Sequence, residues 1–201
     1  SYSKYFRLGK FEFNSTVEGF YNHITNKIEL ITSSPTAAQY GNIGLFESVG
    51  GEFHQTVGYK EFRLQSTFNY TGVYNSLISG EDAFLWSPQL TLQSNYSLSK
   101  LGTNFSLFLN YFGAVNRIFT DVESAETSIQ KQDAYTMMDL TVNQPFFNKK
   151  LRVTLGVRNL FSVVNVNSQL QQTGAHTTSS NFISIRPGRT VFMSLKYEIS
   201  K

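Results

Sequence analysis

The stretch Glu61–Asn75, EFRLQSTFNYTGVYN, divides its side chains into two sets at every second residue. Apolar and aromatic residues form one set: Phe62, Leu64, Phe68, Tyr70 and Tyr74. Polar residues form the other set: Glu61, Arg63, Gln65, Thr67, Asn69, Thr71 and Asn75. This period of two predicts a β-strand with one apolar and one polar surface. Such a strand is far longer than the usual 5–6 residues or so, and a long strand with an aromatic face is typical of a membrane β-barrel.

Two-faced segments of this kind recur along the whole chain of 201 residues. The predicted strands are 1–8, 11–30, 40–58, 61–75, 90–98, 105–115, 138–142, 151–158 and 191–199. Short connections at 9–10, 59–61, 99–102 and 148–150 alternate with long ones at 32–39, 76–83, 121–133 and 163–188. This alternation predicts an all-β, antiparallel transmembrane barrel segment, with short periplasmic turns and long extracellular loops.

Composition also favours a membrane barrel over other classes. Charged residues make up 15% of the chain, against about 25% in typical soluble domains. The mean hydropathy of −0.22 is too polar for helical membrane segments. No apolar run reaches the roughly 20 residues that a transmembrane helix needs. If the chain crosses a membrane, only a barrel satisfies its backbone hydrogen bonds.

Several functional classes are excluded by what the sequence lacks. There is no cysteine, so disulfides, thiolate metal sites and thiol nucleophiles are absent. The net charge of +3 is scattered, and no Lys/Arg cluster indicates nucleic-acid binding. No paired carboxylates, nucleophile elbow or phosphate loop indicates an enzyme, so we expect neither catalysis nor a cofactor. The chain has no initiator Met and no signal peptide at Ser1, and we expect it to be part of a longer polypeptide.

The histidines and one acidic stretch are the candidates for metal or haem binding. His23, His54 and His176 are far apart in sequence, and no two have a spacing typical of metal ligands. The carboxylates of 121–133 (Asp121, Glu123, Glu126 and Asp133) do not match a calcium loop. We therefore expect no metal site, and ordinary wall and loop polarity explains these residues.

The polar face of the strands supplies the predicted lining of the barrel. Its members contact a plug or a passing solute, or simply keep the wall hydrated. These lumen-facing residues are Arg63, Gln65, Asn69, Gln93, Asn95, Asn110, Asn143, Arg152 and Arg158. The opposite face is predicted to contact lipid, through Phe62, Leu64, Phe68, Leu107, Leu109, Val153, Leu155, Met193 and Leu195.

Ligand recognition is expected in the longest loop, 163–188, because loops on a rigid scaffold vary without breaking ladder hydrogen bonds. The loop is rich in neutral hydrogen-bonding side chains, which suit a polar solute or a surface protein. The predicted ligand-binding residues are Gln169, Gln171, Gln172, His176, Thr177 and Asn181.

The segment GVRNLF, Gly156–Phe161, resembles the penultimate strand of TonB-dependent outer-membrane receptors. Five further pieces resemble the C-terminal part of such receptors, particularly those of Bacteroidetes-type bacteria, in order and spacing. They are FYNHITNKIEL at 20–30, QYGNIGLFESVGGEF at 39–53, YTGVYN at 70–75, GAH at 174–176 and GRTVFMSLKYE at 188–198. The resemblance covers essentially the whole chain, so residues 1–201 would form the C-terminal portion of the barrel, about its last eight strands.

The resemblance implies a 22-stranded barrel around an N-terminal plug, which takes up a scarce nutrient such as a ferric siderophore, haem or cobalamin. The plug and the TonB-contacting region lie outside this chain. The implied partners are the lipid and lipopolysaccharide of the bacterial outer membrane, the plug and remaining barrel, and the TonB complex. A surface lipoprotein is a further candidate partner.

Two other architectures remain open from the sequence. One is a complete eight-stranded outer-membrane barrel of structural or adhesin type, since eight strands can close around a side-chain-filled interior. The other is a soluble β-sandwich binding module, in which the Phe and Tyr faces would form an interior core.

Overall fold

The computed structural model describes residues 1–201 except 35–36, 77–83, 121–126, 169–181, 186 and 200–201. The described residues form strands joined by turns and irregular segments, and none forms a helix that could cross a membrane. The strands are β1 (Tyr2–Leu8), β2 (Phe11–Ser34), β3 (Ala37–Tyr59), β4 (Phe62–Asn75), β5 (Leu85–Leu98), β6 (Thr103–Phe112), β7 (Val115–Thr120), β8 (Thr127–Gln132), β9 (Tyr135–Phe146), β10 (Leu151–Arg158), β11 (Asn165–Asn167), β12 (Phe182–Ser184) and β13 (Thr190–Tyr197).

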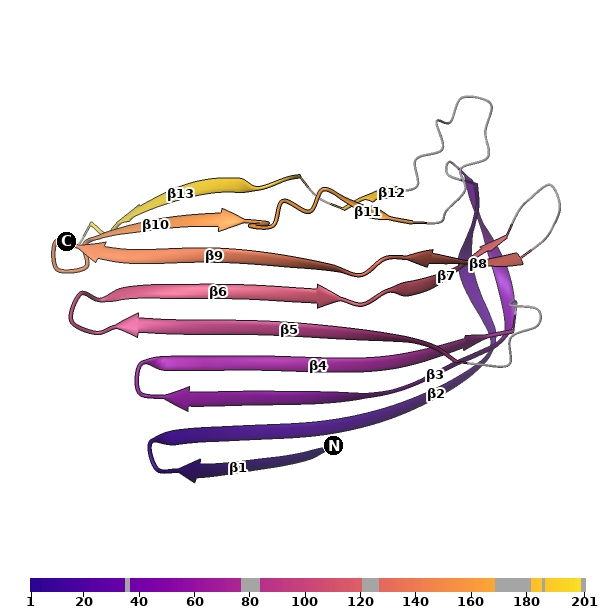
Figure 1. Ribbon diagram of the computed structural model, residues 1–201, viewed down its shortest axis with the longest axis horizontal. Coiled ribbons are helices and arrows are strands. Elements are labelled where there is room, and N and C mark those ends of the chain that lie inside the picture. Colours follow the sequence, from indigo (N-terminus) through magenta and orange to yellow (C-terminus); the bar gives the residue numbers. More distant parts are fainter. Residues whose placement is uncertain (35–36, 77–83, 121–126, 169–181, 186, 200–201) are drawn as a thin grey trace.

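One antiparallel sheet dominates the structure (Figure 1). Its nine strands lie in the order β1-β2-β3-β4-β5-β6-β9-β10-β13 and correspond one to one to the nine predicted segments. The short turns all lie at one end, and the hairpins β7–β8 and β11–β12 extend from the other end. The all-β antiparallel prediction is confirmed. Because β1 and β13 are the two edges of the sheet, this segment does not close on itself as an eight-stranded barrel.

The cross-strand register aligns the apolar sets of neighbouring strands on one face. Residues directly opposite one another on antiparallel strands point to the same side of the sheet. All residues predicted to face lipid fall on this side, which we call the apolar face. One row across it reads Phe6, Phe13, Val57, Leu64, Ser94, Leu107, Leu140, Val157 and Val191.

An unbroken aromatic row crosses the apolar face next to the short turns. Direct pairing aligns Phe11, Tyr59, Phe62, Tyr96 and Phe105 on five successive strands, and we call these residues the turn-side aromatic row. The Phe11 and Tyr59 rings stack with centroids 4.4 Å apart. Aromatic girdles of this kind mark the interfaces of a membrane with water.

A second aromatic group lies farther along the same face. Tyr70 and Trp86 stack with ring centroids 4.8 Å apart, and Tyr21 lies in the same row as Trp86. Ten residues separate Phe11 from Tyr21 along β2, which is about 33 Å of strand. At a tilt of about 40°, this length gives an apolar band about 25 Å tall, the height expected for a barrel in the outer membrane.

The sheet has almost no buried core. Among the described residues, Met137 and Val166 are the only hydrophobic side chains that are fully buried, whereas Phe53 and Phe68 remain more than 40% exposed. A β-sandwich buries the inner faces of two sheets against each other. The described part of the chain has no second large sheet, so the sandwich alternative is wrong.

Several predicted loops contain strands. The prediction of a loop over 32–39 was wrong, because β2 continues to Ser34 and β3 begins at Ala37, with a register shift at Thr32/Ser34. The prediction that 121–133 has no strand was wrong for β8, which pairs with β7, and the loop 163–188 contains β11 and β12. Val115 belongs to β7 and not to β6. Backbone pairing holds these polar stretches as strands without the alternation that the prediction required.

Aromatic rings cover glycines at two points of the sheet. At Gly72, an added Cβ would lie 2.8 Å from the Trp86 indole, and at Gly156 it would collide with the Phe192 ring. The direct pairs Gly72–Trp86 and Gly156–Phe192 explain these contacts. The glycines therefore let bulky rings lie flat on the neighbouring strand.

Phe68→Arg tests the assignment of the faces. Phe68 lies near the middle of the apolar band, where an arginine should lower the free energy of unfolding by about 2–4 kcal/mol. The neighbouring residue Asn69 lies on the polar face near Glu52, so Asn69→Arg should lower the free energy of unfolding much less. Urea unfolding of both variants in lipid vesicles measures the difference. Equal losses for the two variants would contradict the assignment.

Candidate functional site

The residues predicted to line the barrel share the face opposite the aromatic rows. The register pairs Arg63 with Asn95, Gln65 with Gln93, and Asn143 with Thr154 on this polar face. Asn69, Asn110, Arg152 and Arg158 lie at positions of the same parity. The structure thus brings all nine together on one surface, while their contact with a plug or solute stays a prediction.

Neutral side chains bridge neighbouring strands across this polar face. His54 Nδ1 lies 2.8 Å from Thr67 Oγ1, which gives His54 an ordinary wall partner and no metal ligand set. Farther along, Asn69 Nδ2 donates to Glu52 Oε2 at 3.4 Å. The other bridges are Thr91 Oγ1 to Asn110 Oδ1 (2.8 Å), Ser106 Oγ to Asn95 Oδ1 (2.8 Å) and Asn143 Nδ2 to Thr154 Oγ1 (3.0 Å). Such hydrogen-bonding groups are compatible with a hydrated interior.

Three arginines of the polar face form no ion pair with a described acidic residue. Arg63 and Arg152 are exposed, and no hydrogen bond or ion pair joins either of them to a described residue. The Arg158 guanidinium lies over the Phe192 ring, 4.9 Å from its centroid. By contrast, Arg7 pairs with Glu12 near the short turns. Arg63 and Arg152 therefore leave two positive charges without described partners, on a face that also carries Glu18 and Glu52.

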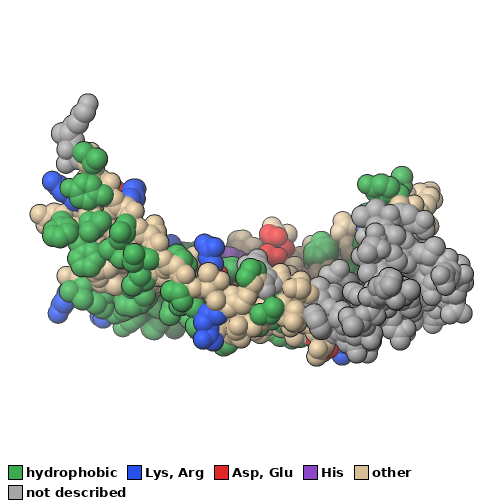
Figure 2. All heavy atoms as spheres, turned by 90° about the horizontal axis from the view of Figure 1, so that it is seen from above, with side chains coloured by type: hydrophobic (Ala, Val, Ile, Leu, Met, Phe, Trp, Pro, Cys, Tyr) green, Lys and Arg blue, Asp and Glu red, His purple; other side chains and the backbone are tan. Residues whose placement is uncertain are grey.

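The two faces exchange their polarity beyond the apolar band. At the edge of the band the polar face carries Phe20, and beyond the band it carries the direct pair Ile24–Phe46. Lys27 Nζ lies 3.6 Å from the Phe46 ring centroid. Phe20 and Ile24 are 38% and 41% exposed, so apolar side chains lie on this face on either side of the hydrogen-bonded pair Asn22–Ser48. Figure 2 shows the hollow of the curved sheet, where acidic and histidine side chains appear among polar ones.

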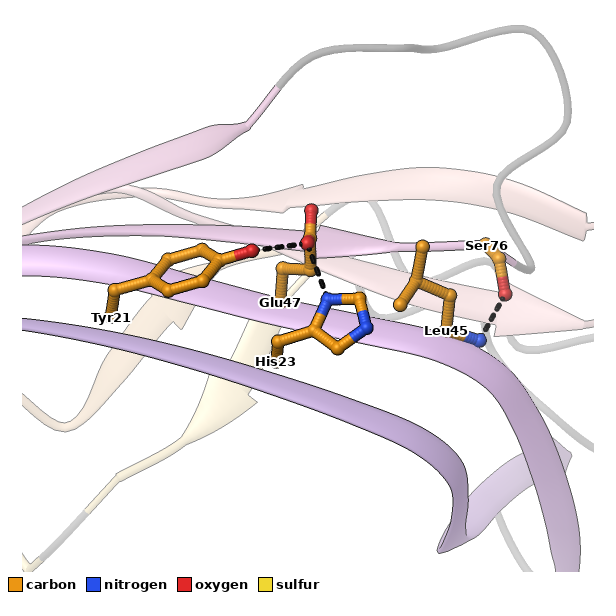
Figure 3. A network of polar contacts seen from close by, with 5 residues as sticks. All are labelled: Tyr21, His23, Leu45, Glu47 and Ser76. Carbon is orange, nitrogen blue, oxygen red and sulfur yellow. Dashed lines mark hydrogen bonds and ion pairs between the residues drawn. The ribbon is translucent and has the colours of Figure 1, made fainter.

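On the opposite side of β2 and β3, a polar cluster replaces the apolar face (Figure 3). The Tyr21 hydroxyl donates to Glu47 Oε1 at 2.5 Å, and His23 Nδ1 lies 2.7 Å from the same oxygen. Strand register places these three side chains together, since His23 pairs directly with Glu47. Nearby, the Ser76 hydroxyl accepts from the Leu45 amide at 2.9 Å and so ends the β3–β4 ladder.

The environment of Glu47 favours its charged form. Glu47 lies one row beyond the Tyr21–Trp86 row, outside the apolar band and at the level of the headgroups. The hydrogen bond from Tyr21, and then the one from His23, lower the pKa of the Glu47 carboxyl below its ordinary value. The cluster is therefore intact at neutral pH. It loses its contribution as the pH falls through the lowered pKa of Glu47.

Asn159 fixes the base of the longest loop. It is 3% exposed with φ of 51°, directly after β10. Its Nδ2 donates to the carbonyls of Val163 and Pro187 at 2.9 and 3.0 Å, and its Oδ1 accepts from the Val163 amide at 2.9 Å. Its own amide donates to Asp139 Oδ1 at 2.8 Å. One side chain thus ties together both ends of the loop 163–188.

The predicted ligand-binding residues Gln169, Gln171, Gln172, His176, Thr177 and Asn181 lie outside the described residues, as do Asp121, Glu123 and Glu126. Asp133 Oδ2 accepts from Asn167 Nδ2 at 3.3 Å. Within the described part of the chain, no three His, Cys, Asp or Glu side chains gather as metal ligands.

Sequence reasoning missed Asn159 and the Tyr21–Glu47–His23 cluster. The GVRNLF segment contains Asn159 but drew attention only through its resemblance to receptor sequences. The signal that could have found Asn159 is an asparagine directly after a strand, which is suited to positive φ. The cluster gave no comparable signal, since 26 residues separate Tyr21 from Glu47 and only the register brings them together.

Tyr21→Phe tests the cause of the Glu47 shift. Loss of the phenol donor should raise the pKa of Glu47 towards that of a free carboxyl, since His23 remains as the smaller influence. Tyr40→Phe is the control, because Tyr40 is 81% exposed and lies farther out on β3. Infrared titration of the carboxyl, assigned with Glu47→Gln, gives the pKa. An unchanged value in Tyr21→Phe would disprove the assignment.

Asn159→Ala tests the bracing of the loop base. It removes three side-chain hydrogen bonds and leaves part-buried backbone groups unpaired, which should cost about 2 kcal/mol of stability. Asn159→Gly should cost a similar amount if the hydrogen bonds, and not the positive φ, are decisive. Asn167→Ala, at an exposed asparagine, is the control. If urea unfolds the Asn159 and Asn167 variants at the same concentration, the bracing role is refuted.

Several solved structures share this fold. The ferripyoverdine receptor of Pseudomonas aeruginosa matches with a TM-score of 0.61 and 16% identity, over 94% of this chain and 25% of that one. The FrpB iron transporter of Neisseria meningitidis matches with a TM-score of 0.62 and 14% identity, over 96% and 30%. The FpvAI–pyocin S2 complex matches with a TM-score of 0.62 and 17% identity, over 94% and 25%. No curated protein sequence matches significantly.

This chain thus spans between 25% and 30% of the length of these neighbours. The neighbours come from Pseudomonas and Neisseria, so the Bacteroidetes type stays a prediction. The family model described as TonB dependent receptor-like, beta-barrel, matches residues 3–160. Members of this family are outer-membrane receptors and transporters, not enzymes. The chain therefore belongs to the TonB-dependent receptor β-barrel family and resides in the outer membrane.

Proposed function

We propose that this chain forms part of the barrel wall and the extracellular loops of a receptor for active uptake of a scarce nutrient. The observation that carries the proposal is the polar face, on which nine predicted lining residues align opposite an apolar face about 25 Å tall. A wall with this division separates lipid from a hydrated interior. The apolar face would contact outer-membrane lipid and lipopolysaccharide.

Candidate nutrients include a ferric siderophore, haem and cobalamin. One structural neighbour was solved with ferripyoverdine, and another is named an iron transporter. These neighbours support a ferric chelate as the first substrate to test. The apolar surface around Phe20, Ile24 and Phe46 would suit a chelate with an apolar or aromatic part.

The polar face would hold the plug of the same receptor. Arg63 and Arg152 present positive charge without an acidic partner among the described residues, so they are the best candidates to pair with plug carboxylates. Coupling to the TonB complex would pass through a region outside this chain. A lipoprotein at the cell surface is a further possible partner of the extracellular loops.

Within this chain, specificity would reside in the loop 163–188. Asn159 anchors both ends of that loop on the rigid wall, so its middle can vary without loss of the sheet. Gln169, Gln171, Gln172, His176, Thr177 and Asn181 would supply its polar contacts.

Deletion of 169–180 in the full-length receptor tests this assignment. We expect normal surface abundance, because Asn159 and its partners Val163 and Pro187 remain. Uptake of a panel of radioactive ferric chelates should fall severalfold for the cognate compound. The matched control deletes 121–126, a shorter acidic segment. Normal abundance together with unchanged uptake would remove the loop 163–188 from ligand recognition.

A further inference from the structure

Lysines gather in the short turns of the sheet. Each of the four turns, 9–10, 60–61, 99–102 and 147–150, carries at least one lysine, and Glu61 is the only acidic residue in them. Figure 2 shows Lys and Arg side chains towards this end of the molecule. The five lysines are all exposed: Lys10, Lys60, Lys100, Lys149 and Lys150. We call them the basic rim.

Charge is sorted differently at the other end of the strands. In the sequence, the connection 76–84 carries Glu81 and Asp82 with no Lys or Arg. The segment 121–126 likewise carries three acidic residues and no basic one. The connection 159–189 carries Arg186 and Arg189 and no acidic residue, so the connections at this end have mixed charge, whereas every short turn carries lysine.

The basic rim lies directly beside the turn-side aromatic row. Lys10 precedes Phe11 in the chain, and Lys60 Nζ lies 5.4 Å from the centroid of the Tyr59 ring. One residue of strand is about 3.3 Å, so the ammonium groups lie just beyond the apolar band. Phospholipid phosphates occupy this level, and lysine side chains extend readily to it.

A cavity in the β5–β6 turn combines charge with an apolar lining. It has a volume of about 460 Å³, and its lining includes Tyr96, Leu98, Lys100, Leu101 and Glu61. Leu101 is 63% exposed in a turn, where water alone would favour a polar residue. An ammonium group beside an apolar surface fits a phosphate attached to acyl chains.

We propose that the basic rim binds the phosphate groups of anionic phospholipids in the periplasmic leaflet. Each lysine near an anionic surface strengthens binding about fivefold. The rim also opposes movement of this end of the barrel into the hydrocarbon, because that movement would desolvate the ammonium groups. The proposal depends on the membrane location of the chain and is independent of its cargo.

The test uses the full-length receptor in nanodiscs of phosphatidylcholine. Electron spin resonance measures how strongly spin-labelled phosphatidylglycerol is preferred over spin-labelled phosphatidylcholine at the protein surface. We expect a severalfold preference that declines as salt is added, since exposed charges are screened. Replacing the five lysines by glutamine should reduce it severalfold, whereas replacing them by arginine should retain it. Lys131→Gln, at the opposite end, should leave it unchanged.

Equal lipid preference in the glutamine variant and the unchanged protein would overturn the proposal, as would a preference insensitive to salt. Loss of preference in the arginine variant would also overturn it, because charge would not be the cause. Full competition by soluble glycerol phosphate would reassign the rim to free phosphate and overturn the lipid proposal. If the variant with all five Lys→Gln substitutions does not assemble, a double variant can replace it. The double variant Lys149→Gln/Lys150→Gln, with both changes in one turn, should lower the lipid preference to half or less.

Discussion

The backbone hydrogen-bond ladder is the constraint on which the rest of this structure depends. Inside a membrane, each unpaired N–H or C=O group costs several kcal/mol, so a chain that crosses by strands must pair each strand with its neighbours. The nine-stranded sheet does this without a hydrophobic core of its own, since Met137 and Val166 alone are fully buried hydrophobic residues in the described part. Side chains are then free to specialise by face. The face that contacts lipid is apolar, and the face that contacts water is polar.

The same ladder explains why the functional features lie where they do. Within the apolar band, outward positions are mostly apolar, and Ser15 and Gln55, which are exceptions, hydrogen-bond to each other. Most polar chemistry therefore lies on the inward face, where Asn, Gln, Thr and Arg align across strands. Beyond the band this restriction ends. Tyr21, His23 and Glu47 then form a polar cluster on the outward side, while Phe20, Ile24 and Phe46 occupy the inward side. Asn159 belongs to the same boundary, because the chain leaves the ladder there and needs other hydrogen-bond partners.

The alternation of apolar and polar residues predicted the barrel wall well, because successive residues of a membrane strand face lipid and the barrel interior in turn. Residues such as Leu64 and Gln65 differ in polarity and must point to opposite sides, so nine strands and their faces followed from the sequence. The same rule failed outside the membrane. Thr127–Gln132 pairs with β7 although nothing in its sequence alternates, and Thr32–Ser34 continues a hairpin past the predicted end. A strand with water on both faces can carry polar residues at every position. Its sequence then shows no period of two, although its backbone is paired.

The candidate site was less predictable than the wall. Asn159 makes its contacts through backbone groups of Val163 and Pro187, whose identity carries no information about the partner. The Glu47 cluster depends on register between segments that are distant in sequence. The aromatic rows also depend on register, since the sequence shows aromatic strand faces but not which rings lie side by side.

The Ser76 hydroxyl, which takes the place of the next backbone partner at Leu45, marks where the wall becomes a two-stranded ribbon. From Leu45 back to Ala37, β3 keeps β2 as its neighbour, but β4 has ended at Asn75. On that side, the backbone groups of the ribbon have no strand of the described sheet to shield them from water. Opening of this part of the hairpin would break only hydrogen bonds between β2 and β3 and would leave the pairing of the wall intact. The outer part of β2 and β3 can thus change its shape without loss of ladder hydrogen bonds inside the membrane.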